Sequence, residues 1–468
     1  ITMMCGLLVP SLSGLMAQVT VQATSGVASA NYATVSAAFA AINSGTHQGA
    51  VTILVTGNTA EPGAPVALLK SASPSNYSSV YLRPQGGNWT IAGTITGSRG
   101  IIELSGADNV TIDGDDPNTA GARNLTIGFA STAATITACV RISSNSTSGT
   151  DGANNNTVKN CILIGNRSGG STTATYGINM SNYSTSSLGT GGYSSLNNTF
   201  ENNLITRVYH GIWASGASST YPNKGTIIRN NVLGDNTTAN NIGARGILIS
   251  NSSIANGDGN ALISGNEIMV GDPGTTGLSA TIYGIEVGTG NKDIIIERNN
   301  IHDVVNQSAS GYGAHGIYIS GISDNIRIRN NIIRDMKASR YSTTTFSSQN
   351  SGVYFSSSAT GIKMDNNTIV LSQTNTTGTQ AAYVSPCVYA TSSAVFSSFQ
   401  NNILVNSQNT TGAFGFYSLG TGNISTGTVN RNDYYVPVGN VGYYNAANRT
   451  TLAAWQTATS KDANSLNI

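Results

Sequence analysis

The chain has 468 residues, of which only 9% are charged, and its net charge is +1. So small a charge gives no field that would attract nucleic acid or an anionic membrane surface, and neither is expected as a partner. Val, Ile and Thr recur throughout, which favours a β-rich fold over a disordered chain. The four cysteines are widely spaced, which argues against a zinc site or a disulfide scaffold. Buried free thiols are expected, with a Cys139–Cys161 bridge as the alternative.

The first segment, residues 1–18, reads ITMMCGLLVPSLSGLMAQ and is apolar up to the small residues near Ala17. It is too short to span a bilayer comfortably, and Pro10 interrupts it. The pattern predicts the apolar part of a secretory signal peptide, truncated because it lacks an initiating Met and a positively charged start. A buried N-terminal strand is the alternative. We therefore expect a secreted or cell-surface protein with no membrane span in the mature chain.

Residues 19–90 contain a candidate helix followed by a strand. The stretch YATVSAAFAAINSG places Val35, Phe39 and Ile42 on one side of a helix, and AVTILVTG is typical of a buried strand. This region is predicted to hold the N-terminal cap and the first strands.

The segment DGDDP at 113–117 is the first acidic cluster. Its carboxylates could bind calcium, the one cofactor considered, through Asp113, Asp115 and Asp116. Asp is also favoured in turns, and a turn is the expected structure.

Beyond residue 90 the sequence repeats a short pattern, apolar-x-x-Asn-x-apolar, as in DIIIERNNIHD and NIRIRNNIIRD. The interval between copies is about 28 to 42 residues, within the range of solenoid repeats. Cys161 and Asp115 occupy the Asn position in two earlier copies. In the others this position is held by Asn203, Asn231, Asn266, Asn299, Asn331, Asn367, Asn402 and Asn432.

A second pattern, in which Gly-Ile starts an alternation of apolar and variable residues, occurs in most of the same periods. Examples are YGINM at Tyr176, HGIWA at His210 and HGIYI at His315. Such alternation predicts strands with one buried face. Each period then holds two or three short strands with no helical pattern between them, and these strands must stack in rungs about 4.8 Å apart. The predicted fold is all-β, a parallel β-helix solenoid.

The recurrent asparagine has a physical explanation at a corner between two strands. A buried amide can donate to and accept from the turn backbone, and stacked neighbours can bond to one another along the solenoid. The tolerance of Asn for left-handed backbone angles also suits a corner. These asparagines are therefore predicted to be structural, and Ser/Thr/Gly-rich stretches such as YSTSSLGTGGYSS are predicted to be irregular loops.

Together the two patterns resemble the repeats of right-handed parallel β-helix proteins of the pectate-lyase-like superfamily, over residues 91–445. The resemblance implies a single-stranded, right-handed β-helix of the bacterial secreted or cell-surface type, whose first rung is covered by a capping helix within residues 19–90. The stretch from Asn430 to Leu466 resembles tails of large bacterial cell-surface proteins, including type IX secretion cargo, and residues 446–468 are predicted to be a C-terminal tail. A short helix is expected at 451–457, without a closing cap, and the natural chain is expected to continue.

Equivalent positions of a β-helix align in columns, so candidate sites are sought down columns. The residue before each Gly and the residue two after it are predicted to form an exposed strip on one sheet. Aromatic faces stack on sugar rings, so the predicted partner is an extracellular polysaccharide or a cell-surface glycan. Burial beneath loops is the alternative. The predicted ligand-binding residues are Tyr176, His210, Trp213, Tyr283, His315, Tyr318 and Tyr354.

A third column follows the asparagine by four residues and holds Asp235, Asp303 and Asp335, with His302 and Arg334 preceding two of them. Neighbouring carboxylates could bind calcium or split their pKa values for acid–base work. Polysaccharide lyases of the family use acidic clusters with calcium and a basic residue that abstracts a proton. The resemblance thus implies a catalytic set of His302, Asp303, Arg334 and Asp335. The alternative is that each Asp serves a turn and pairs with its neighbour.

The low charge and the scarcity of acid–base groups favour a module that is not an enzyme. The leading hypothesis is a secreted or cell-surface β-helix of an adhesin-like or structural protein that binds polysaccharide along the strip. The alternative is a polysaccharide lyase or glycoside hydrolase acting on an extracellular glycan, and a third reading is a fibre subunit. An enzyme would need carboxylates and a base to converge, within roughly 5 to 10 Å for paired carboxylates.

Overall fold

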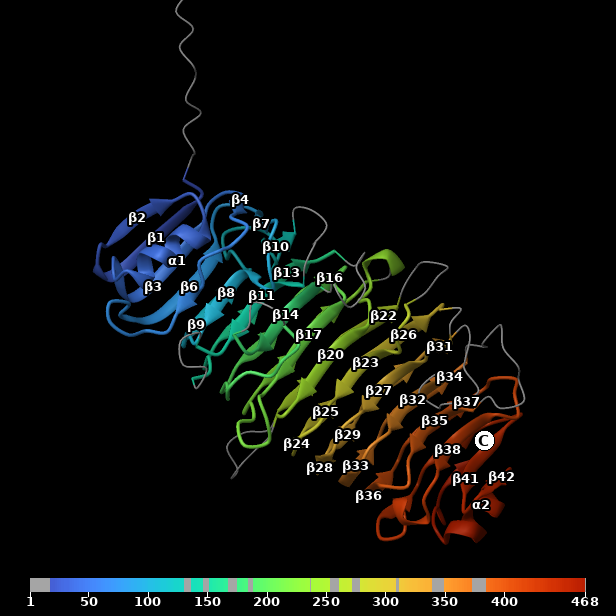
Figure 1. Cartoon of the computed structure of the whole chain (residues 1–468). Helices are drawn as coiled ribbons and strands as arrows, with labels where there is room; N and C mark the ends of the chain where they lie inside the picture. The colour runs from blue at the N-terminus through green and yellow to red at the C-terminus, as the bar shows by residue number, and fades with distance from the viewer. Residues whose placement is uncertain are drawn as a thin grey trace, which may run out of the picture.

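Short strands follow one another around a common axis, and each stacks on its counterpart one turn further along the chain (Figure 1). The structure is a computed structural model that describes residues 17–129, 136–145, 151–166, 175–183, 188–235, 237–252, 261–271, 278–308, 311–338, 349–372 and 384–467. Within these residues the strands form three long sheets, A, B and C.

Sheet A begins with antiparallel pairing and continues as a parallel stack. Its strands are β1 (Val19–Gly26), β2 (Ser29–Tyr32), β3 (His47–Val55), β6 (Tyr77–Pro84), β9 (Val110–Asp113), β12 (Thr157–Lys159), β15 (Thr199–Glu201), β18 (Ile227–Arg229), β21 (Leu262–Ser264), β24 (Asn291–Lys292), β25 (Ile295–Glu297), β28 (Ser323–Asp324), β29 (Arg327–Arg329), β33 (Ala359–Asp365), β36 (Ala394–Gln400) and β39 (Thr428–Asn430). β1 is antiparallel to β2 and β3. Parallel stacking starts where β3 meets β6, ahead of the predicted boundary at residue 91.

Sheet B carries the strands that follow the repeated asparagine. Its strands are β4 (Thr59–Glu61), β7 (Trp89–Gly93), β10 (Leu125–Phe129), β13 (Cys161–Ile164), β16 (Leu204–Thr206), β19 (Val232–Leu233), β22 (Glu267–Gly271), β26 (Asn300–Asn306), β30 (Ile332–Arg334), β31 (Met336–Ala338), β34 (Thr368–Leu371), β37 (Ile403–Asn406), β40 (Asp433–Tyr435) and β43 (Leu466–Asn467). The register keeps equivalent residues together, because Ile301 pairs with Ile333 and Ile333 pairs with Ile369.

Sheet C carries the Gly-Ile pattern. Its strands are β5 (Leu68–Leu69), β8 (Gly100–Ser105), β11 (Thr137–Ser143), β14 (Thr175–Ser181), β17 (His210–Ser215), β20 (Arg245–Ser250), β23 (Ile282–Val287), β27 (Ala314–Ile319), β32 (Asn350–Phe355), β35 (Ser385–Ala390), β38 (Ala413–Ser418), β41 (Asn440–Tyr444) and β42 (Ala447–Arg449). β42 folds back antiparallel on β41, whereas β5 to β41 stack in parallel. The predicted parallel β-helix is confirmed.

The core lies between the three sheets and is filled by the apolar positions of both sequence patterns. The glycine of one pattern accommodates the isoleucine of the other. A Cβ atom at Gly284 would lie 2.4 Å from Ile301 Cγ2 and 2.6 Å from the carbonyl oxygen of Gly316. The backbone of sheet C therefore approaches sheet B too closely for any side chain at this position, which explains why the two patterns recur together.

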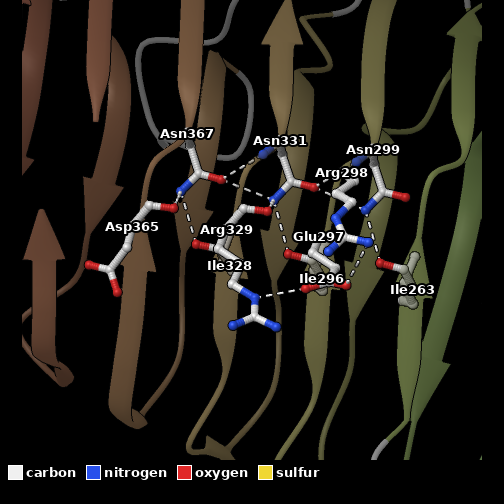
Figure 2. A network of polar contacts seen from close by, with 10 residues as sticks. All are labelled: Ile263, Ile296, Glu297, Arg298, Asn299, Ile328, Arg329, Asn331, Asp365 and Asn367. Carbon is white, nitrogen blue, oxygen red and sulfur yellow. Dashed lines mark hydrogen bonds and ion pairs between the residues drawn. The ribbon is translucent and has the colours of Figure 1, made fainter. Parts of the chain in front are cut away.

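The repeated asparagines form a ladder at the corner between sheets A and B (Figure 2). The backbone N and Nδ2 of Asn299 both donate to Oδ1 of Asn331 over 3.0 Å, while Nδ2 of Asn331 donates to the carbonyl oxygen of Ile296. The same step recurs along the solenoid, and the amides are buried. These hydrogen bonds, which the predicted structural role requires, link Asn203, Asn231, Asn266, Asn299, Asn331, Asn367, Asn402 and Asn432.

The left-handed conformation lies one residue before the ladder, contrary to the expectation that the ladder asparagine itself adopts it. Arg298 has φ 55°, Asn330 has φ 56° and Asn366 has φ 59°. In each of these pairs the first residue turns the chain, and the asparagine that follows it satisfies the buried backbone of the corner. The first position needs only a residue that tolerates positive φ, whereas the second needs an amide.

The N-terminal end is covered by helix α1 (Val35–Asn43), as predicted (Figure 1). Thr34 caps it by accepting from the backbone N of Ala37 over 3.1 Å. The helix buries Val35, Phe39 and Ile42, the three residues that the sequence pattern placed on one face. This packing covers the apolar end of the first rung, which would otherwise face water.

The C-terminal residues also form a cap, so the expectation that no closing cap exists was wrong. Helix α2 (Leu452–Thr459) begins after Thr451 and buries Trp455 completely. Asp462 then accepts hydrogen bonds from Trp455 Nε1 (2.7 Å), Tyr434 Oη (2.9 Å) and Asn432 Nδ2 (2.9 Å). The tail thereby ends the asparagine ladder with a carboxylate in place of the next amide. Two short 3₁₀ turns, η2 (Thr238–Asn240) and η5 (Thr421–Asn423), complete the helical elements of the described residues.

Cys139, Cys161 and Cys387 are buried and free, and burial raises the pKa of each thiol. The expectation of free thiols is confirmed for these three, and the Cys139–Cys161 bridge is absent. Cys5 and nearly all of the segment assigned to a signal peptide lie outside the described residues. In the part of the chain that is described, no helix is long and apolar enough to cross a bilayer.

Candidate functional site

The two columns predicted on sheet C do align on one face, outside the core. Tyr176 pairs with His210, and Tyr283 pairs with His315. Rings of the two columns touch, because the centroids of His210 and Trp213 are 5.1 Å apart. Tyr176 also belongs to an apolar cluster separate from the main core, with Trp213 packed against it.

Exposure of this strip was largely mispredicted. Only Trp213 and Tyr318 are partly exposed. Tyr176, His210, Tyr283, His315 and Tyr354 are buried, each with at most 8% of its surface accessible. The cause is mutual packing of large rings one rung apart, together with neighbouring side chains.

The lower half of the strip, which is the half nearer the N-terminus, is a cluster of aromatic and charged groups around Arg245. The guanidinium carbon of Arg245 lies 5.8 Å from the ring centroid of Trp213 and 5.5 Å from that of Tyr283. Arg245 forms an ion pair with Glu286, which also accepts from Ser320 Oγ over 2.9 Å. Arg245 thus joins two aromatic rungs by cation–π contacts, and its own charge is balanced by a carboxylate.

Two nitrogen atoms of this cluster are buried without a hydrogen-bond partner: Nδ1 of His210 and Nε1 of Trp213. An unmatched buried polar atom of this kind costs roughly 1–3 kcal/mol. Burial, and secondarily the charge of Arg245, holds the pKa of His210 well below its usual 6.5, so the imidazole is neutral at neutral pH. Because both atoms are buried, they represent a local cost to the stability of the cluster.

The upper half of the strip is a stack of tyrosines. Ring centroids are 5.0 Å apart for Tyr318 and Tyr354, 5.1 Å for Tyr389 and Tyr417, and 4.2 Å for Tyr417 and Tyr443. The rings of the last pair are almost parallel and stacked, with 2° between their planes. These rings cover one another's faces, so most of this stack offers edges and hydroxyl groups rather than the sugar-stacking faces that the sequence suggested.

Tyr417 and Tyr443 were missed from the sequence. Tyr417 lies two residues after Gly415, as the pattern requires, and could have been found in FGFYS. Tyr443 follows Gly442 directly, but its register places it beside Tyr417. In this last rung the glycine lies one residue later than in the other copies, so the sequence pattern does not mark Tyr443.

A buried ion pair near the first rungs of the same sheet was also missed. Arg141 and Glu103 are completely buried, 3.0 Å apart, and Arg99 pairs with the same carboxylate. Arg141 further donates to the carbonyl oxygens of Ser98 and Asn182. No sequence pattern marked it, because these strands carry the Gly-Ile pattern only weakly. Its charges are satisfied internally, which indicates a structural role.

The candidate catalytic residues lie on sheet B, away from the cluster around Arg245. Nδ1 of His302 lies 2.7 Å from Oδ2 of Asp303, and Arg334 pairs with Asp335 at 2.7 Å. Both Asp residues have positive φ, 51° and 62°. Each therefore occupies a corner and contacts the residue before it, which matches the alternative given for them. Asp235 likewise accepts from its own turn. A catalytic role stays a prediction.

The acidic cluster at 113–117 is occupied by protein donors. Asp113 accepts from Tyr81 Oη (2.8 Å) and pairs with Lys159 (3.2 Å). Asp116 is fully buried and accepts from the backbone N of Gly86 over 2.7 Å and from a turn that follows it. Asp115 lies between them and donates its backbone N to Asp113. Among the described residues, no group of three His, Cys, Asp or Glu is placed to hold a metal ion.

Comparison with known proteins finds no matching protein-family model and no matching curated protein. Solved structures with a similar course of the chain include the A-modules of two mannuronan C-5 epimerases of Azotobacter vinelandii. AlgE6 is 13% identical (93% of each chain covered, TM-score 0.37), and AlgE4 is 14% identical (84% of this chain and 91% of that one, TM-score 0.40). PfbA, a surface adhesin of Streptococcus pneumoniae, is 11% identical, with 88% of each chain covered and a TM-score of 0.38. Likenesses this distant assign no function to the chain.

Proposed function

We propose that this protein is a secreted or cell-surface β-helix module, of an adhesin-like or structural kind, that binds a polysaccharide on the outer face of sheet C around Trp213. The observation that carries the proposal is the indole of Trp213, a partly exposed ring that packs against His210 and Arg245 on this face.

The surroundings of Trp213 suit a sugar. The indole is partly exposed and is the largest ring of the lower strip, which gives an apolar surface for the C–H face of a pyranose. Arg245 beside it is neutralised by Glu286, so the site carries no net charge of its own. A neutral glycan fits such a site better than a strongly anionic one.

The contacts and positions of the carboxylates favour binding without catalysis. Glu286, in the cluster around Arg245, is engaged by both Arg245 and Ser320. Asp303 and Asp335 belong to sheet B. The neutral His210 could accept a proton, but it faces no free carboxylate partner among the described contacts.

The test is a panel of soluble polysaccharides, assayed for both binding and release of shorter products, with and without calcium. Trp213→Ala should weaken binding of the selected glycan by about tenfold or more, because it removes the ring on which the sugar stacks. Trp89→Ala is the matched control, since Trp89 is a partly exposed tryptophan on sheet B. Equal binding by Trp213→Ala and wild type would refute the site. Product release lost in His210→Gln or Asp303→Ala would replace the binding module by an enzyme.

A further inference from the structure

Sheet A carries a column of charges that alternate in sign. It is formed by the outward residue that ends each strand, two positions before the ladder position. Lys159 pairs with Asp113 at 3.2 Å, Arg229 with Glu201 at 2.5 Å and Arg329 with Glu297 at 2.7 Å. Ser264 separates the last pair from the others. The column consists of Asp113, Lys159, Glu201, Arg229, Ser264, Glu297, Arg329 and Asp365, and continues with the uncharged Gln400 and Asn430.

Such alternation cancels the charge of the face. Each cation has a carboxylate one rung below it, so the column creates little field at a distance. Six of the 43 Lys, Arg, Asp and Glu residues of the chain form these three pairs. An excess of positive or negative charge on this face is therefore a departure from its pattern of paired charges.

An excess of positive charge appears at strands β29 and β33. The second outward column of sheet A holds Ile227, Leu262 and Ile295 on the lower strands, but Arg327 and Lys363 on these two. Arg327 and Lys363 are partners in adjacent strands, so two like charges stand one rung apart. Neither forms an ion pair within the described residues. Like charges in direct register destabilise a sheet unless an anion lies between them.

These cations line a surface depression of about 230 Å³, together with Arg329 and Asp365. Asp365 offsets only one of the three positive charges, and its Oδ1 already accepts from Ser398 Oγ (2.6 Å) and from the backbone N of Gln400 (3.1 Å). Arg329 reaches toward Glu297 on the preceding strand, as Figure 2 shows. The depression thus has three cationic side chains and one carboxylate that is already engaged.

We propose that this depression binds a carboxylate or sulfate group of an acidic polysaccharide, with Arg327 and Lys363 donating from consecutive rungs. Arginine offers a planar fork that matches a carboxylate or sulfate, and lysine adds a second charge-assisted donor. The site lies on sheet A, apart from the cluster around Trp213 on sheet C. It rests on the proposed function only in taking a glycan as the ligand class.

A glycan fits better than a nucleic acid. A duplex is held by many phosphate contacts spread along its backbone. Here the excess charge is confined to one depression, and the rest of the column is neutralised in pairs. The site can hold one or two anionic groups, as a chain with spaced acidic sugars presents them.

The test compares wild type with the double variant Arg327→Ser/Lys363→Ser. Its matched control is Arg229→Ser, which removes a paired cation from the same sheet. The probes are polygalacturonate for carboxylates, dextran sulfate for sulfates, neutral dextran and a short duplex DNA. Wild type should bind at least one acidic polymer, and the double variant should bind it about tenfold more weakly, with the control unchanged.

Failure of wild type to bind either acidic polymer would overturn the proposal, as would equal affinity of wild type and the double variant. Binding of neutral dextran or of DNA as tight as that of the acidic polymers would overturn the assignment to an acidic glycan. Trp213→Ala separates the two sites: it should leave the effect of the double variant intact, and loss of acidic-polymer binding in Trp213→Ala alone would place the ligand on sheet C instead.

Discussion

Two columns of side chains follow the axis of the solenoid, and they differ in how much the residue type varies from rung to rung. At the corner between sheets A and B, the same amide recurs from Asn203 to Asn432 and repeats one set of hydrogen bonds of about 3.0 Å. On the outer face of sheet C the residue changes at almost every rung, from His210 through Arg245 to Tyr283.

The difference shows where the sequence is free to vary. The corner amide has to satisfy buried backbone groups on two rungs, which only one residue type does well. The outer face has no such demand, and what it carries is a mixture of stacked rings, an ion pair and unmatched donors. The uniform column specifies the scaffold, and the variable one carries the candidate site.

The largest expected effect is on the uniform column. Asn331→Ala should lower the free energy of unfolding by about 3 kcal/mol, because it leaves the backbone N and Nδ2 of Asn299 and the carbonyl oxygen of Ile296 without their partner. Chemical denaturation monitored by circular dichroism measures it. The control is Asn330→Gly, one residue earlier, where positive φ suits glycine and little change is expected. Equal losses in both variants would contradict the ladder's role.

Close contact between sheets B and C gives the next largest effect. Gly284→Ala places a methyl group 2.4 Å from Ile301 Cγ2, which should cost about 2 kcal/mol of stability. Gly422→Ala is the control, because a Cβ there meets nothing within 4 Å. If the two variants unfold at the same denaturant concentration, the glycine pattern does not reflect close packing.

A pH effect is expected from the variable column. His210 stays neutral in the folded protein, whereas the unfolded chain binds its proton below about pH 6.5. Stability contributed in this way is complete above that pH and falls as the pH drops toward the lowered folded-state pKa, by at most ~1.4 kcal/mol per pH unit. His210→Gln should lose this part of the pH dependence between about pH 6.5 and 5. Identical pH slopes for variant and wild type would show that His210 is not held neutral by the fold.

The smallest effect is expected at the corner carboxylates. Asp303→Asn should change stability by no more than about 0.5 kcal/mol, because Asn also tolerates positive φ and the side chain is half exposed. Glycan binding and product release should also be unchanged. A large fall in product release would restore the catalytic reading of this column.

The fold was predictable because its rules are local and repeat. The asparagine and Gly-Ile patterns each state a packing requirement, and together they determine the order and register of the stacked strands. A second corner ladder escaped notice, although Asn156 and Asn198 bond as the first ladder does, with Asn198 Oδ1 accepting from the backbone N of Asn156 over 3.0 Å. It has fewer copies, so repetition did not reveal it.

The candidate site was less predictable because it depends on how unlike side chains meet across rungs. Sequence spacing placed Trp213 and Arg245 on one face, but it could not show that Arg245 pairs with Glu286 or that tyrosine rings stack face to face. Burial of the strip follows from these contacts. The cationic depression at Arg327 and Lys363 was missed for a related reason: its signal is a break in a charge pattern that becomes visible only in register.

The most direct test of the distinction between scaffold and site compares Asn331→Ala with Trp213→Ala in one experiment. Melting temperature and glycan Kd are measured for both, with binding taken at a temperature where each variant is folded. Asn331→Ala should melt markedly lower and bind with an unchanged Kd, whereas Trp213→Ala should bind weakly and melt close to wild type. Weak binding by folded Asn331→Ala, or wild-type binding by Trp213→Ala, would contradict the account.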